Sequence, residues 1–167
     1  MIANLLALFL AANTPATPIA ICLGPFCLDE HARELQRTYG AASVQNGGNT
    51  LCYEDRGLYV HFQFDDHDEN NPPLSGLYVG KEPSAFCPAS TKARRHFPKL
   101  MTPSGITIGD PLDKVQKLYA DRPQFEVQTF DDGSQSVTWD VCGCELTTID
   151  VRLEHGRVVS ITLDDSE

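Results

Sequence analysis

Basic residues are scarce in this chain. Of its 167 residues, 13 are Lys or Arg and 23 are Asp or Glu, so the formal net charge is −10. A chain of this charge is repelled by the phosphate backbone of nucleic acids and by anionic membrane surfaces, which argues against both as partners. The same charge would favour encounter with a basic protein. Composition therefore favours a protein partner, and a basic one.

Long hydrophobic runs are also missing. The apolar stretch at residues 2–12 is too short to span a bilayer and has the length of a signal-peptide core. We interpret residues 1–20, which carry no charged side chain and end in small residues and prolines, as a signal peptide. The alternative is a buried N-terminal strand or helix. Because Ile21 is too large to precede a lipidated cysteine, we expect a periplasmic or secreted protein without an integral membrane segment or a lipid anchor.

The motifs of common catalytic sites are absent as well. The sequence has no Gly-x-Ser-x-Gly, no phosphate-binding loop and no His-Glu-x-x-His, and its five His residues are scattered. The acidic run at residues 65–71 lacks the spacing and the glycine of an EF-hand, so we interpret it as a solvated loop and leave cation binding there open. We expect no enzyme, no catalytic residue, no metal site and no cofactor.

Six cysteines are present, and an even number in an exported protein indicates disulfides. A zinc site is disfavoured because the chain lacks two Cys-x-x-Cys pairs. Six cysteines allow 15 pairings, so the connectivity stays open. Cys22 and Cys27 could close a small loop, and Cys52 and Cys87 could tie a strand to the linker that follows it. Cys142 and Cys144 could join each other only with strain, or each could pair elsewhere.

Two short amphipathic helices are predicted. The clearer one lies in the stretch GITIGDPLDKVQKLY, residues 105–119. Asp110 is the expected N-cap and Pro111 the first helical residue, followed by an apolar stripe that ends at Tyr119. The other helix is expected over residues 28–39, with Gly40 as its stop. Helices this short are unstable alone in water, so each must lie on another element.

Each predicted helix is followed by strand patterns. Residues 43–45 and 50–54 flank a turn and are expected to pair as a hairpin. Residues 58–64 alternate between apolar and polar side chains, and a shorter strand follows around residues 77–79. After the second helix, alternation recurs around Trp139 and again through residues 149–163. We expect Trp139 to be a core residue.

Because the two halves repeat the order of helix, aromatic strand and alternating strand, we interpret them as diverged copies. The predicted fold class is α+β, with two tandem modules that each pack a short helical segment on one face of an antiparallel sheet of about four strands. The expected boundaries are residues 21–81 for the first module, 82–104 for a linker and 105–167 for the second. Whether the modules share one sheet stays open.

The stretch GITIGDPLDKVQKLY and the later VRLEHGRVVSITL resemble the opening and the close of the beta-lactamase-inhibitory-protein-like domains. The small outer-membrane assembly lipoproteins share that opening. In the inhibitor family two such modules occur in tandem, with disulfides and a secretion signal, and the resemblance would cover residues 23–163 of this chain.

The resemblance implies that helices cover one face of the sheet while the open face binds a protein. Here that face would carry Tyr59, His61, Gln63 and Tyr78 in the first module and Asp150 and Arg152 in the second. The implied function is an exported protein of the cell envelope, of the inhibitor or immunity type, that neutralises a hydrolase or toxin. The alternative is an accessory of outer-membrane assembly or envelope integrity.

Overall fold

The fold is mostly antiparallel β-sheet. The computed structural model describes residues 22–28, 30–45, 49–65, 72–122, 125–140 and 147–165. Strands make up 47% of these residues and helices 13%. The prediction of an α+β fold with two tandem modules of about four strands each is therefore wrong. Within the described ranges no helix has the length and apolar character that a membrane crossing needs.

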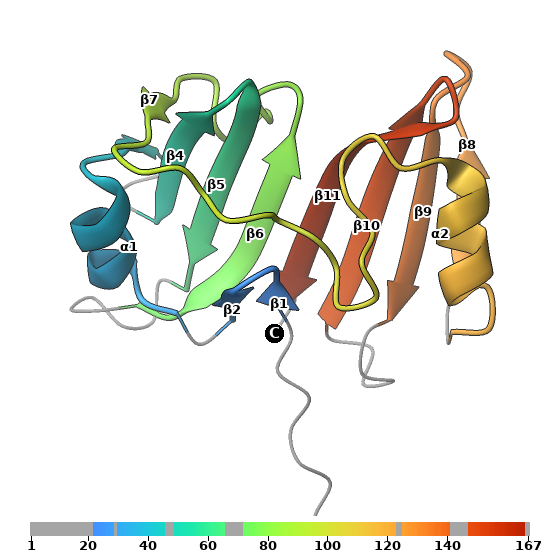
Figure 1. Ribbon diagram of the computed structural model, residues 1–167, viewed down its shortest axis with the longest axis horizontal. Helices are drawn as coiled ribbons and strands as arrows, with labels where there is room; N and C mark the ends of the chain where they lie inside the picture. The colour runs from blue at the N-terminus through green and yellow to red at the C-terminus, as the bar shows by residue number, and fades with distance from the viewer. Residues whose placement is uncertain are drawn as a thin grey trace, which may run out of the picture.

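One sheet forms the body of the molecule (Figure 1). Its order over the described residues is β3-β4-β5-β6-β11-β10-β9-β8, and β7 pairs with β4 in parallel. The strands are β3 Ser43–Gln45, β4 Thr50–Asp55, β5 Leu58–Phe64, β6 Leu74–Gly80, β7 Thr91–Lys92, β8 Glu126–Thr129, β9 Gln135–Asp140, β10 Thr147–Glu154 and β11 Arg157–Asp165.

The pairing of β6 with β11 is what overturns the predicted modules. Each strand is the last of its own run, and separate modules would leave both as unpaired edges. Instead they pair antiparallel from Ser160 opposite Gly80 to Asp164 opposite Gly76. The covered side of this pairing buries four apolar side chains almost completely: Leu77, Val79, Ile161 and Leu163. Joining the two runs thus satisfies both edges and makes one apolar core.

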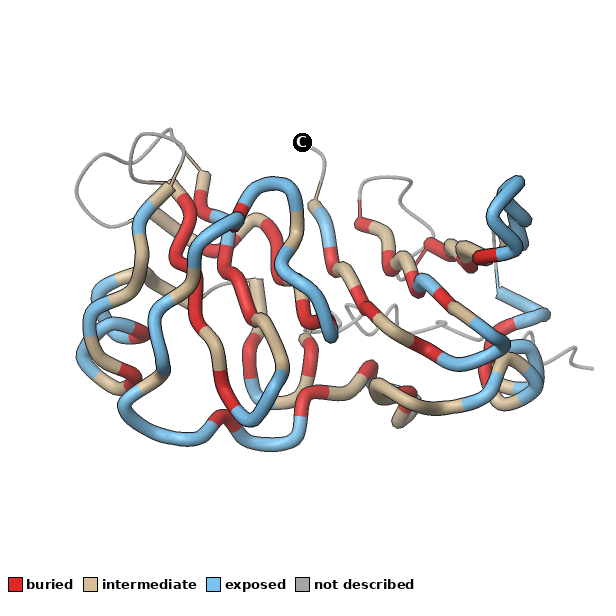
Figure 2. The backbone as a smooth tube through the Cα atoms, turned by 90° about the horizontal axis from the view of Figure 1, so that it is seen from above, coloured by how far each residue is buried: buried red, intermediate tan, exposed pale blue. Residues whose placement is uncertain are grey.

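One face of the sheet carries most of its cover, whereas a loop of residues 81–90 crosses the other face. The helices α1, Ala32–Tyr39, and α2, Leu112–Tyr119, lie on the first face, and so does the connecting segment, residues 93–111 (Figures 1 and 2). The two helices lie toward opposite ends of the sheet, and the connecting segment crosses its middle (Figure 1). The core therefore forms a layer between this cover and one face of the sheet.

Both helices begin later than the sequence predicts. The first starts at Ala32 rather than Leu28, because His31 forms a β-bridge with Pro73 and has an extended backbone itself. The second has Pro111, not Asp110, at its N-cap. The Asp110 carboxylate instead accepts hydrogen bonds from the Thr107 backbone N–H at 2.8 Å and from Lys114 Nζ at 2.7 Å. The prediction of Asp110 as N-cap is therefore wrong, and Asp110 fixes the turn before the helix.

A small N-terminal hairpin holds the connecting segment in place. Its strands are β1, Cys22–Leu23, and β2, Phe26–Cys27, and the disulfide between Cys22 and Cys27 confirms one of the pairings that the sequence suggested. Gly24 in its turn has φ +62° and donates its N–H to the Met101 carbonyl at 2.7 Å. A Cβ at Gly24 would lie 2.6 Å from the Lys99 carbonyl oxygen, so the close approach of the two backbones requires glycine.

The connecting segment also supplies a side chain to the core. Phe97, in the range predicted as a linker, is 3% exposed. The centroid of its ring lies 4.3 Å from the ring centroid of Tyr39 on α1 and 5.6 Å from that of Tyr53 on β4. The ring also contacts Phe26 and Phe62. Because this ring joins the helix, the hairpin and the sheet, the segment around it is part of the folded core.

We expect Phe97→Ala to lower the free energy of unfolding by about 3–5 kcal/mol, the cost of removing a buried aromatic side chain and leaving a cavity. Urea unfolding at pH 7 measures the change. Phe86→Ala is the matched control, because Phe86 is 62% exposed and its removal should change stability by less than about 0.5 kcal/mol. Equal effects of the two substitutions would contradict this account of the connecting segment.

Candidate functional site

The six predicted partner-binding residues lie on the same face of the sheet, opposite the helices. The strand register shows this directly. Tyr59 pairs with Gly80, His61 with Tyr78, and Tyr78 with Thr162 on the next strand. Thr162 in turn pairs with Asp150, and Ser160 pairs with Arg152. Since side chains of directly paired residues point to the same side, one surface carries residues from both halves of the chain.

The structure brings some of these residues together and separates others. His61 and Tyr78 are neighbours, with ring centroids 4.3 Å apart in an edge-on arrangement. Asp150 lies two strands beyond Tyr78, a separation of about 10 Å at the usual strand spacing. Arg152 lies three strands from Tyr59, at about 14 Å. The six residues therefore span a surface and do not form one compact cluster.

A loop of residues 81–90 crosses this face and is held there covalently. Cys52, on the same side of β4 as His61, forms a disulfide with Cys87 of the loop, which confirms the second suggested pairing. The Tyr78 hydroxyl donates to the Glu82 carbonyl at 2.8 Å. A Cβ at Gly80 would lie 2.1 Å from the Tyr78 hydroxyl oxygen, so Tyr78 lies against the bare backbone at Gly80.

His61 lies beneath this loop and is buried, so the prediction that it lies on an open, partner-facing surface is wrong. Only 8% of its surface is accessible. Its Nδ1 lies 3.2 Å from the Ser84 hydroxyl oxygen, while its Nε2 is buried without a hydrogen-bond partner among the described residues. Burial disfavours the imidazolium form and lowers the pKa of His61 from 6.5 to about 4. His61 is therefore neutral at physiological pH.

The loop divides the face into two hollows. One, of about 250 Å³, is lined by three predicted residues, His61, Gln63 and Tyr78, together with residues 84–86 and β11. The other, of about 570 Å³, lies toward Arg152 and the turn at His155. Tyr78, Ser84 and Ala85 line both. A partner that approaches this face would therefore meet the loop first.

The far part of the face is held by hydrogen bonds between neighbouring strands. The Asp150 carboxylate accepts from the Ser136 and Thr138 hydroxyl groups, the latter at 2.9 Å. The Arg152 guanidinium lies 3.7 Å from the Asp132 carboxylate, and half of its side chain is exposed. Asp150 is therefore positioned by its neighbours on β9, whereas Arg152 is available at the surface.

Sequence reasoning missed the residues of the loop, above all Phe86. This side chain is 62% exposed, the largest exposed fraction among the large apolar residues described. It precedes Cys87, which is only 2% exposed because of its disulfide. The suggested bond between Cys52 and Cys87 was a usable signal, since alternation along β4 places Cys52 on the face opposite the core. A loop bonded to Cys52 must then cover that face.

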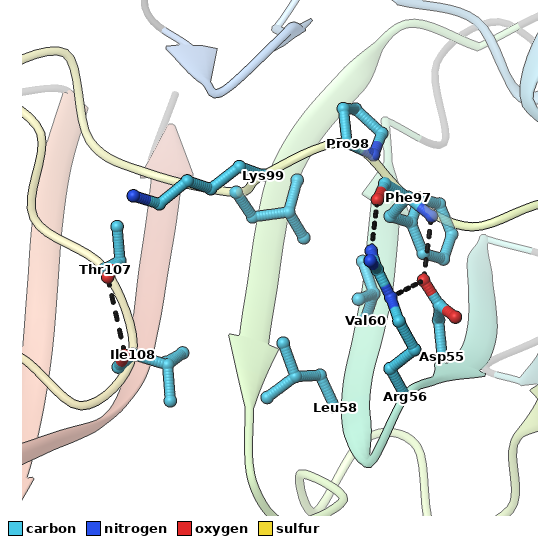
Figure 3. A pocket seen from close by; sticks show the side chains of 10 residues that line it. Asp55, Arg56, Leu58, Val60, Phe97, Pro98, Lys99, Thr107 and Ile108 are labelled. Atoms are coloured by element: carbon cyan, nitrogen blue, oxygen red, sulfur yellow. Dashed lines mark hydrogen bonds and ion pairs between the residues drawn. The ribbon is translucent and has the colours of Figure 1, made fainter.

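A separate pocket of about 400 Å³ opens on the helix-covered face (Figure 3). It lies between β5 and the connecting segment, near the turn that joins β4 to β5. Asp55 at its edge accepts from His96 Nδ1 at 2.6 Å and from the Phe97 backbone N–H at 2.8 Å. Burial raises the pKa of Asp55, but the hydrogen bonds from His96 and Phe97 and the charge of Arg56 outweigh it and lower that pKa below its usual value. Asp55 is therefore an anion that fixes the pocket wall.

Three groups of predicted residues lie outside the described ranges. They are the signal peptide predicted at residues 1–20, the pair Cys142 and Cys144, and most of the acidic run at 65–71. Among the residues that the structure describes, no three His, Cys, Asp or Glu side chains are arranged to hold a metal ion.

The buried His61 predicts a pH dependence of stability. Because its pKa is about 4 in the folded state and 6.5 in the unfolded state, unfolding takes up a proton between these values. Stability should therefore fall as the pH drops from 6.5 to 4, by roughly 3 kcal/mol at most, with no further His61 effect below pH 4. Urea unfolding of the wild type and of His61→Asn across this range measures the difference. Parallel pH profiles for the two proteins would contradict the burial of a neutral His61.

The Cys52–Cys87 disulfide predicts how the loop responds to its removal. We expect the double variant Cys52→Ala, Cys87→Ala to lose about 2–4 kcal/mol of stability, because the unfolded chain is no longer constrained. Removing the disulfide should speed amide hydrogen exchange in residues 81–90 more than in the strands. Exchange in α2 provides the internal control, since it lies far from the loop (Figure 1). Unchanged exchange in the loop would show that the disulfide does not hold it on the sheet.

Comparison with family models, with curated proteins and with solved structures finds no match to this chain. The site is therefore defined by its own geometry. It is a sheet face that joins both halves of the chain, crossed by a disulfide-anchored loop with an exposed aromatic residue.

Proposed function

We propose that this chain is an exported protein of the cell envelope that binds another protein through the loop-crossed sheet face and neutralises it, as an inhibitor or immunity-type protein does. The observation that carries the proposal is Phe86. A phenylalanine that is 62% exposed has an unfavourable contact with water, and its neighbour Cys87 is bonded to the sheet. Because the disulfide already restricts the loop, an aromatic side chain on it loses little conformational entropy when it binds a partner.

The charge of this sheet face favours a basic partner. Of the strand residues on this face, five are acidic and exposed or half-buried, namely Glu54, Glu126, Asp150, Glu154 and Asp164. The basic strand residues on this face are three: Lys92, Arg152 and Arg157. The face is thus acidic within a chain of net charge −10. A basic hydrolase or toxin would be attracted to it over distances of about 10 Å.

The two disulfides support export. Cys22–Cys27 and Cys52–Cys87 are compatible with a secreted or periplasmic protein, because such bonds persist in oxidising compartments. Within this proposal His61 does not contact the partner. It lies under the loop, where its ring packs against Tyr78 and its Nδ1 meets Ser84. Tyr59, Gln63, Arg152 and Phe86 are the proposed contacts.

Capture from an envelope extract of the producing cells tests the proposal. The immobilised chain should retain one protein stoichiometrically, and the double variant Tyr59→Ala, Phe86→Ala should bind that protein at least about 30-fold more weakly, the effect of removing an interface anchor. Tyr78 is left intact because it holds the loop through Glu82.

Val44→Ala is the matched control, since Val44 is 50% exposed on β3 at the edge of the sheet. It should bind like the wild type. If the folded double variant retains the protein as well as the wild type does, the proposed face is wrong. Recovery of a membrane assembly complex in place of a single soluble protein would favour the accessory function instead.

A further inference from the structure

The pocket in Figure 3 is lined by no residue of either helix. The two helices lie toward opposite ends of the sheet, and among the described residues the connecting segment and the N-terminal hairpin cross its middle (Figure 1). The pocket of about 400 Å³ opens between Leu58 and Val60 on β5 and two stretches of the connecting segment, residues 97–100 and 107–108. It is on the opposite side of the sheet from the proposed partner face.

The interior of this pocket is apolar. Val60, Phe97 and Leu100 form buried walls, with exposed fractions of 1%, 3% and 7%. Leu58 and Ile108 are partly buried and pack against the core from the two sides of the pocket. A volume of about 400 Å³ with such a lining is in the range that holds a small organic molecule. The lining favours a ligand with a hydrocarbon body.

The rim of the pocket is basic, although the chain as a whole is acidic. Arg56 and Lys99 lie on different sides of the opening, and both are exposed (Figure 3). Arg56 is held in place, because its Nε donates to Asp55 at 3.2 Å and its guanidinium donates to the Phe97 carbonyl at 2.5 Å. Asp55, the acidic residue of the lining, already accepts from His96 and the Phe97 N–H. Because Asp55 compensates the charge of Arg56, the remaining positive charge of the lining is that of Lys99, which favours one further anion at this rim.

We propose that this pocket binds an amphipathic carboxylate, a molecule with one anionic head and a hydrocarbon chain of the size of a medium-chain fatty acid. The hydrocarbon chain lies along Leu58, Leu100 and Ile108, and the carboxylate lies at the rim near Lys99 and Arg56. Charge complementarity selects an anion over a neutral or cationic molecule of the same shape, and it does so in a chain whose net charge would otherwise repel anions.

Titration with decanoate below its micellar concentration tests the proposal. Methyl NMR should show saturable shifts at Leu58, Leu100 and Ile108, with roughly fivefold weaker binding of decanol and no saturable binding of decyltrimethylammonium, because the rim charge distinguishes the three head groups. Absence of saturable shifts at these methyl groups would overturn the proposal. So would equal binding of the three probes.

Single substitutions test where the carboxylate and the hydrocarbon chain of decanoate lie in the pocket. Lys99→Gln should weaken decanoate binding roughly fivefold, while Lys92→Gln, on exposed β7, should leave it unchanged. Ile108→Trp should fill the pocket and abolish binding. If Ile108→Trp does not fold, the pair of lysine variants decides the outcome, and equal affinities for that pair would overturn the carboxylate assignment.

Carboxylate binding in this pocket does not depend on the proposed protein partner. Tyr59→Ala, Phe86→Ala changes only the opposite face, so it should bind decanoate like the wild type even where protein capture is lost. A loss of decanoate binding in that variant, with its fold intact, would place the probe on the wrong side of the sheet and overturn the site.

Discussion

The hydrogen-bonded pairing of β6 with β11 is the interaction on which the rest of the structure depends. It joins strands that are far apart in the chain, since β6 ends at Gly80 and β11 begins at Arg157, 77 positions later. Each strand would be a vulnerable unpaired edge without the other. Their pairing also aligns four buried apolar side chains on one side and Gly76, Tyr78 and Gly80 opposite Asp164, Thr162 and Ser160 on the other. One continuous core and one continuous outer face both follow from it.

The two faces of the sheet then acquire different roles because they are covered differently. On one, α1, α2, the N-terminal hairpin and the connecting segment bury the apolar side chains, and their uneven cover leaves a pocket near Arg56. On the other, a single loop is attached through the Cys52–Cys87 disulfide and through Tyr78. This loop shields His61 and presents Phe86 to solvent. Exposed aromatic surface next to a rigid anchor is the feature that most favours a binding function.

Local patterns predicted the elements well. Alternation through residues 58–64 correctly separates Val60, Phe62 and Phe64 from Gln63, because strand side chains alternate with a period of two. The burial of Trp139 is confirmed for the same reason. The pairing of β3 with β4 confirms the hairpin that was predicted from the turn residues between them. The helix starts were wrong for two different reasons. His31 pairs with the distant Pro73, a contact that leaves no local signature, whereas the Asp110 carboxylate accepts the Thr107 N–H only three residues away, a local alternative to capping the helix.

By itself, the sequence determined which side of the alternating strands β5, β6, β9, β10 and β11 a residue faces, which segments are helical, and the acidic charge of the chain. These depend on backbone geometry and composition, which are local. Only the tertiary structure decided that nine strands of the described residues form one sheet, that residues 81–90 cover His61, and that Phe97 belongs to the core. These outcomes depend on contacts between residues far apart in the chain, whose free energy is set by surfaces that exist only after folding.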